Sequence, residues 1–154
     1  MEIAHKPAPK KSIRQKFMLG VLIGCGIGLA YSGFVYLRSA GFEAYDSKDY
    51  PRAARFLLPV AATGDAVAQT LVGSMYAIGS GGDQNGEKAV YWLERAATSD
   101  VTEAQTMLGT LYFTGIVVPS DFDKARFWLE KAAAANDAEA AQMLNAIRIK
   151  KNQM

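Results

Sequence analysis

Cysteine and histidine are almost absent from this chain of 154 residues, which contains only Cys25 and His5. A lone cysteine cannot form an intramolecular disulfide. A zinc site built on His and Cys, or a catalytic triad built on His, would need partners that the chain lacks. Asp121 and Asp123 are better explained as helix-cap chemistry than as catalytic acids. We therefore predict that the protein is not an enzyme and binds no metal or cofactor.

Basic residues are also scarce in the body of the chain, where residues 39–147 hold eight Lys or Arg against fourteen Asp or Glu. Nucleic-acid binding needs a basic face that neutralises phosphates, so this composition argues against it. Runs of β-branched residues are few and alanine is abundant, which favours helix. The sequence predicts an all-α protein with room for one small domain.

One long apolar run is present, and it covers residues 17–37 without a charged residue, between Lys16 and Arg38. A helix needs about 20 apolar residues to cross a bilayer, so we predict a single transmembrane helix here. Two alternatives remain open. The sequence before Cys25 resembles a lipoprotein box, and residues 30–32 resemble a signal-peptidase site. Both fit poorly, because the apolar run continues beyond Cys25 and exceeds a signal's usual core of about 7–15 residues.

Positive charge is concentrated before this run, at Lys6, Lys10, Lys11, Arg14 and Lys16. The positive-inside rule then places residues 1–16 in the cytoplasm as a basic tail. In a bacterium, this orientation puts the span in the inner membrane and the repeat domain in the periplasm. Arg38 and other basic residues on the opposite flank weaken this bias.

Small residues recur every fourth position within the apolar run, at Gly20, Gly24, Gly28 and Ser32. This spacing puts them on one helix face, where a second helix could approach closely. We predict that this face pairs with another membrane helix, although glycine is also simply common in membrane helices.

An internal repeat governs the rest of the sequence, with an offset of 36 residues. Residues 68–79 (AQTLVGSMYAIG) match residues 104–115 (AQTMLGTLYFTG), and residues 87–97 (EKAVYWLERAA) match residues 123–133 (DKARFWLEKAA). The first helix of a unit is predicted at residues 66–78, with Gly79 as its stop. Asn85 and Asp121 are predicted N-caps of the second helices. The recurring Tyr and Trp residues are predicted to fill the core.

The unit A-x-x-L-G-x-x-Y-x-x-G, followed by K-A-x-x-W-x-x-K/R-A-A, resembles the Sel1-like repeat, a relative of the tetratricopeptide repeat. Leu108, Gly109, Tyr112, Gly115 and Trp128 of the second unit fit it well, whereas Gly81 departs from the usual valine. The resemblance implies a solenoid of antiparallel helix pairs without a catalytic site. We expect it over residues 38–150, as a half repeat (about 42–64), two repeats (65–100 and 101–136) and a capping helix (137–150).

Positions that break the period are where a binding surface is expected, because the periodic ones are explained by packing. Phe113 replaces Ala77, and the apolar residues Ile116 to Pro119 replace a polar glycine loop. We predict Phe113, Ile116 and Val118 as protein-binding candidates and expect Val117 to pack beneath the loop.

Members of the family act mainly as scaffolds and adaptors, and many bacterial members work in the cell envelope. The resemblance therefore implies a non-enzymatic, membrane-anchored scaffold that binds protein partners of an envelope complex. A single-span accessory subunit of a larger inner-membrane complex is one alternative. An immunity or inhibitor protein against a toxic enzyme is another, and it predicts a neighbouring toxin gene.

Overall fold

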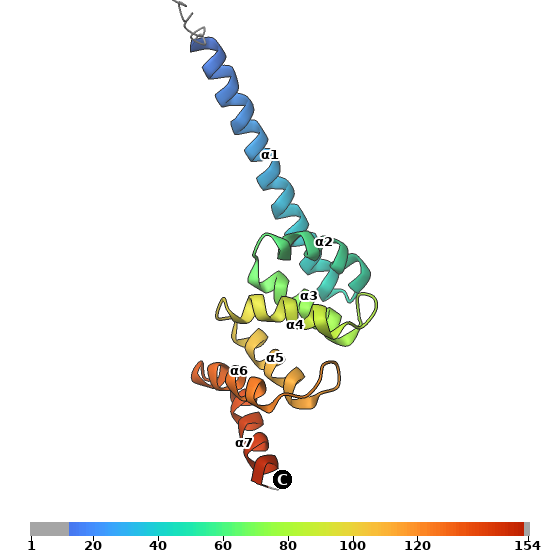
Figure 1. Cartoon of the computed structure of the whole chain (residues 1–154). Helices are drawn as coiled ribbons and strands as arrows, with labels where there is room; N and C mark the ends of the chain where they lie inside the picture. Colours follow the sequence, from blue (N-terminus) through green and yellow to red (C-terminus); the bar gives the residue numbers. More distant parts are fainter. Residues whose placement is uncertain (1–12, 153–154) are drawn as a thin grey trace, which may run out of the picture. The chain divides into compact units, whose positions relative to one another are not determined.

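The structure is a computed structural model that describes the backbone of residues 13–152 and the side chains of residues 30–150 (Figure 1). Within these residues it contains seven helices and no strand, so the all-α prediction is confirmed. The helices are α1 (Ile13–Asp46), α2 (Tyr50–Ala62), α3 (Ala66–Ile78), α4 (Gly86–Ala97), α5 (Thr102–Thr114), α6 (Phe122–Ala134) and α7 (Ala138–Asn152). The chain divides into two compact units, one ending at Tyr36 and the other beginning at Leu37.

The predicted membrane helix, residues 17–37, belongs mostly to the part of α1 whose side chains lie outside the described residues. Among the described residues, no helix is both long and apolar enough to cross a membrane. Of the predicted basic tail, residues 1–16, residues 1–12 also lie outside the described residues.

Local chemistry sets the helix ends within the second unit. Gly79 ends α3 in the left-handed conformation at φ 80°, as predicted, and Gly115 ends α5 in the same way at φ 67°. The side chains of Asn85 and Asp121 accept hydrogen bonds from the backbone N–H groups of Lys88 and Lys124, which confirms both predicted N-caps. These caps satisfy donors that the first turn of a helix leaves free.

Close helix approach explains the periodic glycines. A Cβ at Gly73 would lie 2.7 Å from Cγ of Leu93, and one at Gly109 would lie 2.5 Å from Cγ of Leu129. Both leucines are fully buried. The α3–α4 and α5–α6 pairs are therefore built around the same contact, which only glycine permits at this distance.

The end of α1 makes an equivalent contact with α2. A Cβ at Gly41 would lie 2.6 Å from Cδ2 of Leu57, and both Ala40 and Ala44 are buried. Leu57, Leu93 and Leu129 are one period apart, whereas Gly41 stands closer in sequence to its leucine than Gly73 does, because the α1–α2 turn is shorter. Residues from Leu37 to Asp46 thus occupy the place of a first repeat helix within the second unit.

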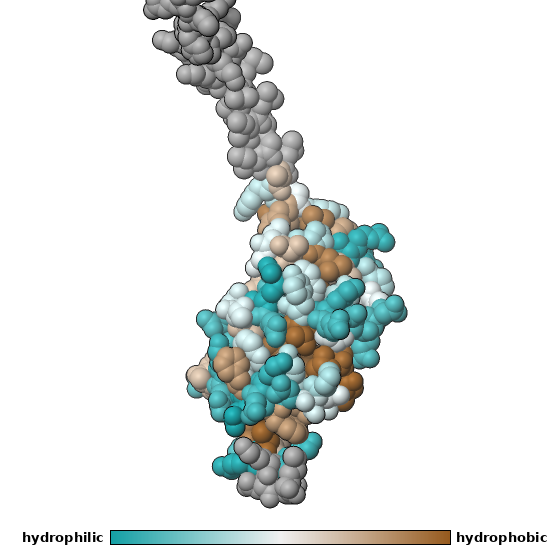
Figure 2. Space-filling view, in the orientation of Figure 1, coloured by the Kyte–Doolittle hydropathy of each residue, from teal (hydrophilic) through white to brown (hydrophobic). Residues whose placement is uncertain are grey.

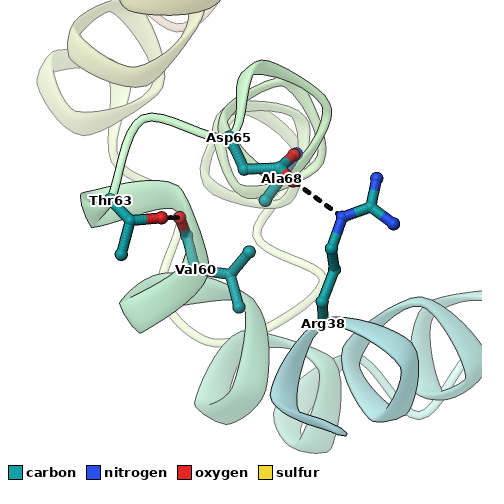
Figure 3. A network of polar contacts seen from close by, with 5 residues as sticks. All are labelled: Arg38, Val60, Thr63, Asp65 and Ala68. Atoms are coloured by element: carbon teal, nitrogen blue, oxygen red, sulfur yellow. Dashed lines mark hydrogen bonds and ion pairs between the residues drawn. The ribbon is translucent and has the colours of Figure 1, made fainter. Parts of the chain in front are cut away.

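An ion pair holds this end of α1 to the start of α3. Arg38 Nε lies 2.7 Å from Asp65 Oδ2, and the other Asp65 oxygen accepts a hydrogen bond from the Ala68 N–H (Figure 3). Burial alone raises the pKa of Asp65, but the Ala68 hydrogen bond and the Arg38 charge outweigh it and keep the pKa below its ordinary value of 3.8. Asp65 therefore caps α3 and binds α1 in the charged state.

Helix α7 closes the other end of the solenoid. Its Ala140 and Ile147 are buried in a core cluster with Trp128 and Leu129, and Met143 and Leu144 pack against that cluster. Asp137 caps this helix, since its carboxylate accepts hydrogen bonds from the Ala140 N–H and the Thr106 hydroxyl. The apolar face of α6 is thereby covered.

Candidate protein-binding surfaces

Two of the three predicted binding residues in the second repeat contribute to packing. Phe113 and Val118 are half-buried and lie against the core cluster. The Phe113 ring meets Phe122 edge-on at 6.0 Å between centroids, and Lys150 Nζ lies 5.6 Å from the Phe113 ring centre. Lys150 is distant in the sequence, so this contact with the Phe113 ring could not be predicted from the repeat.

Ile116 is the exposed member of the set, with 80% of its surface accessible. It lies in the loop between α5 and α6, which projects from the edge of the second unit in Figure 1. Figure 2 shows hydrophobic residues gathered on that same edge. Of the predicted candidates, Ile116 is therefore the one whose side chain is available to a partner.

Of the four residues predicted to form the helix-pairing face, only Ser32 lies among the residues whose side chains the structure describes. Gly20, Gly24 and Gly28 lie in the helical part of α1, but their surroundings are outside the described side chains. Ser32 is exposed. The regular helix keeps these positions in one register, since residues four apart stack on one face.

Sequence reasoning missed a pocket of about 310 Å³ in the first repeat. Residues of α2, α3, the α3–α4 loop and the start of α4 line it: Ala54, Leu58, Val72, Met75, Tyr76, Gly81, Gly82, Asp83, Asn85 and Lys88. We call this the repeat-one pocket. Its volume lies at the lower end of the range of ligand pockets, about 300–1,000 Å³.

The glycine loop is the reason that this pocket exists. Gly81 and Gly82 occupy the positions that Val117 and Val118 hold one period later. Val118 packs against the core in the second repeat, and its Cγ1 and the Val117 carbonyl lie close to Gly86. Gly82 has no side chain to match that of Val118, and both glycines line the open pocket in the first repeat. The departure at Gly81 was the signal in the sequence, but it indicates only a looser loop.

A buried glutamine in each repeat was also missed. Gln69 and Gln105 are almost fully buried, and the Nε2 amide of each donates to a carbonyl of the preceding helix, Ala61 O at 3.0 Å and Ala97 O at 3.1 Å. Each bond satisfies a carbonyl at a helix C-terminus. Recurrence of a polar residue within an apolar stripe could have revealed this role.

No cluster of three or more His, Cys, Asp or Glu suited to a metal ion is found in the part of the chain that the structure describes. The described surfaces offer the exposed Ile116 side chain and, in the repeat-one pocket, a mixture of apolar and polar side chains.

Comparison with known families and structures agrees with this architecture. A family model described as Sel1 repeat matches residues 66–101 and 102–137, which confirms the resemblance predicted from the sequence. The crystal structure of a Sel1 repeat protein from Oxalobacter formigenes is 30% identical, with a TM-score of 0.67 over 75% of this chain and 46% of that one.

A protective antigen of uropathogenic Escherichia coli, described as displaying an SLR fold, is 22% identical with a TM-score of 0.69. The match covers 76% of this chain and 26% of the antigen, and at this identity it shows the fold alone. The chain thus spans less than half the length of both solved structures. A comparison with curated proteins finds no match.

Proposed function

Because this chain is a Sel1-like repeat protein, we propose that it is a non-enzymatic scaffold that binds protein partners of a bacterial envelope complex. The observation that carries the proposal is the tandem Sel1 repeat. Its recurring residues, such as Leu93 and Leu129, are fully buried between helices. Stacked helix pairs expose an extended surface, which suits recognition of a protein better than chemistry on a small substrate.

We further propose that residues 17–37 anchor the scaffold in the inner membrane, with residues 1–16 in the cytoplasm and the repeats in the periplasm. The uncharged run of 21 residues supports a single span. The basic cluster that precedes the run supports the orientation.

An accessory subunit of a larger inner-membrane complex is the second candidate. It is favoured by the regular spacing of Gly20, Gly24, Gly28 and Ser32, because small residues in one register allow close helix contact. In this case the membrane helix would supply most of the binding, and the repeats would add to it.

Purification of the tagged full chain from its host in mild detergent, with mass spectrometry of what accompanies it, tests the scaffold. We expect specific partners to be recovered. Recovery of the chain alone would contradict the proposal.

The double substitution Gly24→Leu and Gly28→Leu distinguishes the two candidates, with Val21→Leu and Ile27→Leu as a matched control. Partners that survive the glycine substitutions are bound by the repeats, whereas partners lost only with those substitutions indicate the accessory subunit.

Orientation is tested by labelling a cysteine at the exposed position Gln142, in a chain whose single cysteine is replaced by Cys25→Ser. A membrane-impermeant maleimide should label Gln142→Cys in cells whose outer membrane alone is permeabilised. Labelling only after the inner membrane is broken would place the repeats in the cytoplasm.

A further inference from the structure

The two repeats differ in the side chains that surround one equivalent lysine. Lys88 and Lys124 occupy the same position of the period, in the first turns of α4 and α6. Each ammonium lies over a tyrosine ring, Lys88 at 5.2 Å from the Tyr76 centre and Lys124 at 5.0 Å from the Tyr112 centre. Their remaining surroundings are not alike.

In the second repeat, acidic side chains satisfy both members of the pair. Lys124 Nζ lies 3.6 Å from Asp121 Oδ2, and the Tyr112 hydroxyl donates to Glu94 Oε1 at 3.4 Å. Burial, followed by the Glu94 charge, raises the pKa of Tyr112. A hydrogen bond from the Lys124 backbone N–H, together with the lysine charge, holds the pKa of Asp121 below its ordinary value.

In the first repeat, both acids are replaced by uncharged residues. Asn85 stands at the position of Asp121, and Leu58 stands at the position of Glu94. Among the described residues, no carboxylate forms an ion pair with Lys88, and the Tyr76 hydroxyl has no hydrogen-bond partner. Asp83 also lines the pocket but does not pair with this lysine. The repeat-one pocket is therefore lined by a cation and a hydroxyl donor that pair with no carboxylate of the described residues.

Part of the lining of the same pocket is apolar. Leu58, Val72 and Met75 contribute apolar side chains to it, and Gly81 and Gly82 line it without side chains. An occupant that complements this lining needs an apolar group for the apolar side chains and a carboxylate for Lys88, Tyr76 and the Asn85 amide. A volume of about 310 Å³ suits one or two side chains of a peptide.

We propose that the repeat-one pocket binds a segment of a protein partner in which an apolar residue lies beside Asp or Glu. The proposal rests on the scaffold function, and it names the chemistry that one surface of the scaffold recognises. The apolar side chain takes the place that the Val118 side chain holds in the second repeat. The carboxylate replaces the missing Asp121 and Glu94.

Panning a phage-displayed library of random linear peptides against the immobilised full chain, in mild detergent, tests the proposal. We expect enriched peptides to share an apolar residue next to Asp or Glu. A synthetic peptide of the enriched sequence is then measured by fluorescence anisotropy, beside a copy whose acid is replaced by Gln or Asn. We expect this neutral copy to bind about tenfold more weakly, as a charge-assisted hydrogen bond predicts.

Two substitutions locate the binding in the pocket. Gly81→Val adds a side chain to the pocket. The backbone tolerates its first atom, because a Cβ there would lie no closer than 3.4 Å to Ala54 Cβ and the Tyr50 carbonyl. Lys88→Glu reverses the charge. Each should weaken peptide binding about tenfold or more. Lys124→Glu, at the same position of the second repeat, is the matched control and should change binding less than about twofold.

Three results would overturn the proposal: a library without enriched peptides, enriched peptides that lack an acid, or peptides that bind Gly81→Val and Lys88→Glu as tightly as the parent chain. Tryptophan fluorescence of each variant confirms that the solenoid is folded. If partners still accompany the full chain while any of these results holds, the scaffold function stands and the pocket assignment fails.

Discussion

At the scale of single residues, the contact between a helical glycine and a buried leucine is the most demanding feature of the solenoid. A Cβ at Gly73 or Gly109 would meet a leucine Cγ that has no free space to move into, because both leucines are fully buried. Added atoms in a packed core force side chains and helices apart. The glycines therefore set the distance at which each helix pair can close.

We expect Gly73→Ala and Gly109→Ala each to lower the free energy of unfolding by about 2 kcal/mol, since overpacking outweighs alanine's better helix propensity. This change in the free energy of unfolding is measured by urea unfolding, with the fluorescence of Trp92 and Trp128 as the signal. Gly81→Ala is the control, because its Cβ would make only ordinary contacts, and it should change stability by less than about 0.5 kcal/mol. Unchanged stability at Gly73 and Gly109 would show that the leucines can shift without cost.

Asp65 combines a helix cap with an ion pair, and two substitutions separate these roles. Asp65→Asn keeps an oxygen for the Ala68 N–H but loses the charge that faces Arg38, so at neutral pH it should cost no more than about 1 kcal/mol. Asp65→Ala also loses the cap and should cost about 1 kcal/mol more. Equal losses would mean that the cap contributes nothing.

The pH dependence of Asp65 follows from its lowered pKa. A carboxyl group that is more acidic in the folded state stabilises that state above its unfolded pKa, and the benefit is lost as pH falls. The difference in unfolding free energy between the parent and Asp65→Asn should therefore be constant near neutral pH and shrink below about pH 3.8. A difference that grows on acidification would contradict this sign.

At the scale of helices, the N-cap of α4 links stability to the proposed binding. Asn85 already caps the helix, but Asp121 does so with a charge that favours the helix N-terminus and pairs with Lys124. We expect Asn85→Asp to raise stability by about 0.3–1 kcal/mol. The same substitution should weaken peptide binding, because the new carboxylate would occupy Lys88. Thermal unfolding and anisotropy on the same samples test both effects, and Asn85→Ser is the uncharged control.

Helix ends could be predicted from the sequence because they depend on nearby residues. Gly79, Asn85 and Asp121 act within a few positions of where they stand, so their roles can be read from the repeat itself. The repeat-one pocket could not be predicted in this way, because its lining combines Ala54 and Leu58 of the preceding helix with a glycine loop. The cover that Lys150 gives to Phe113 is equally remote in the sequence. Contacts between helices decide which period-breaking residues are open to a partner.

At the scale of the whole molecule, the solenoid is a short linear array in which each helix contacts its neighbours in sequence. Helix α7 contacts α6 and α5, so its influence should be strongest in the second repeat. The two tryptophans are placed to report on this, because Trp92 belongs to the first repeat and Trp128 to the second. Whether the array unfolds as one unit or from its end is therefore measurable.

Ile147→Asp removes an apolar side chain from the core cluster and buries a charge, whereas Ile149 in the same helix is 56% exposed. We expect Ile147→Asp to cost at least about 3 kcal/mol and Ile149→Asp less than about 0.5 kcal/mol. Measured in chains with a single tryptophan, Ile147→Asp should lower the urea midpoint more when Trp128 is the reporter than when Trp92 is. Equal shifts would show that so short an array has a single cooperative transition. In that case the end of α1, packed through Gly41 and Leu57, and α7 would stabilise both repeats together.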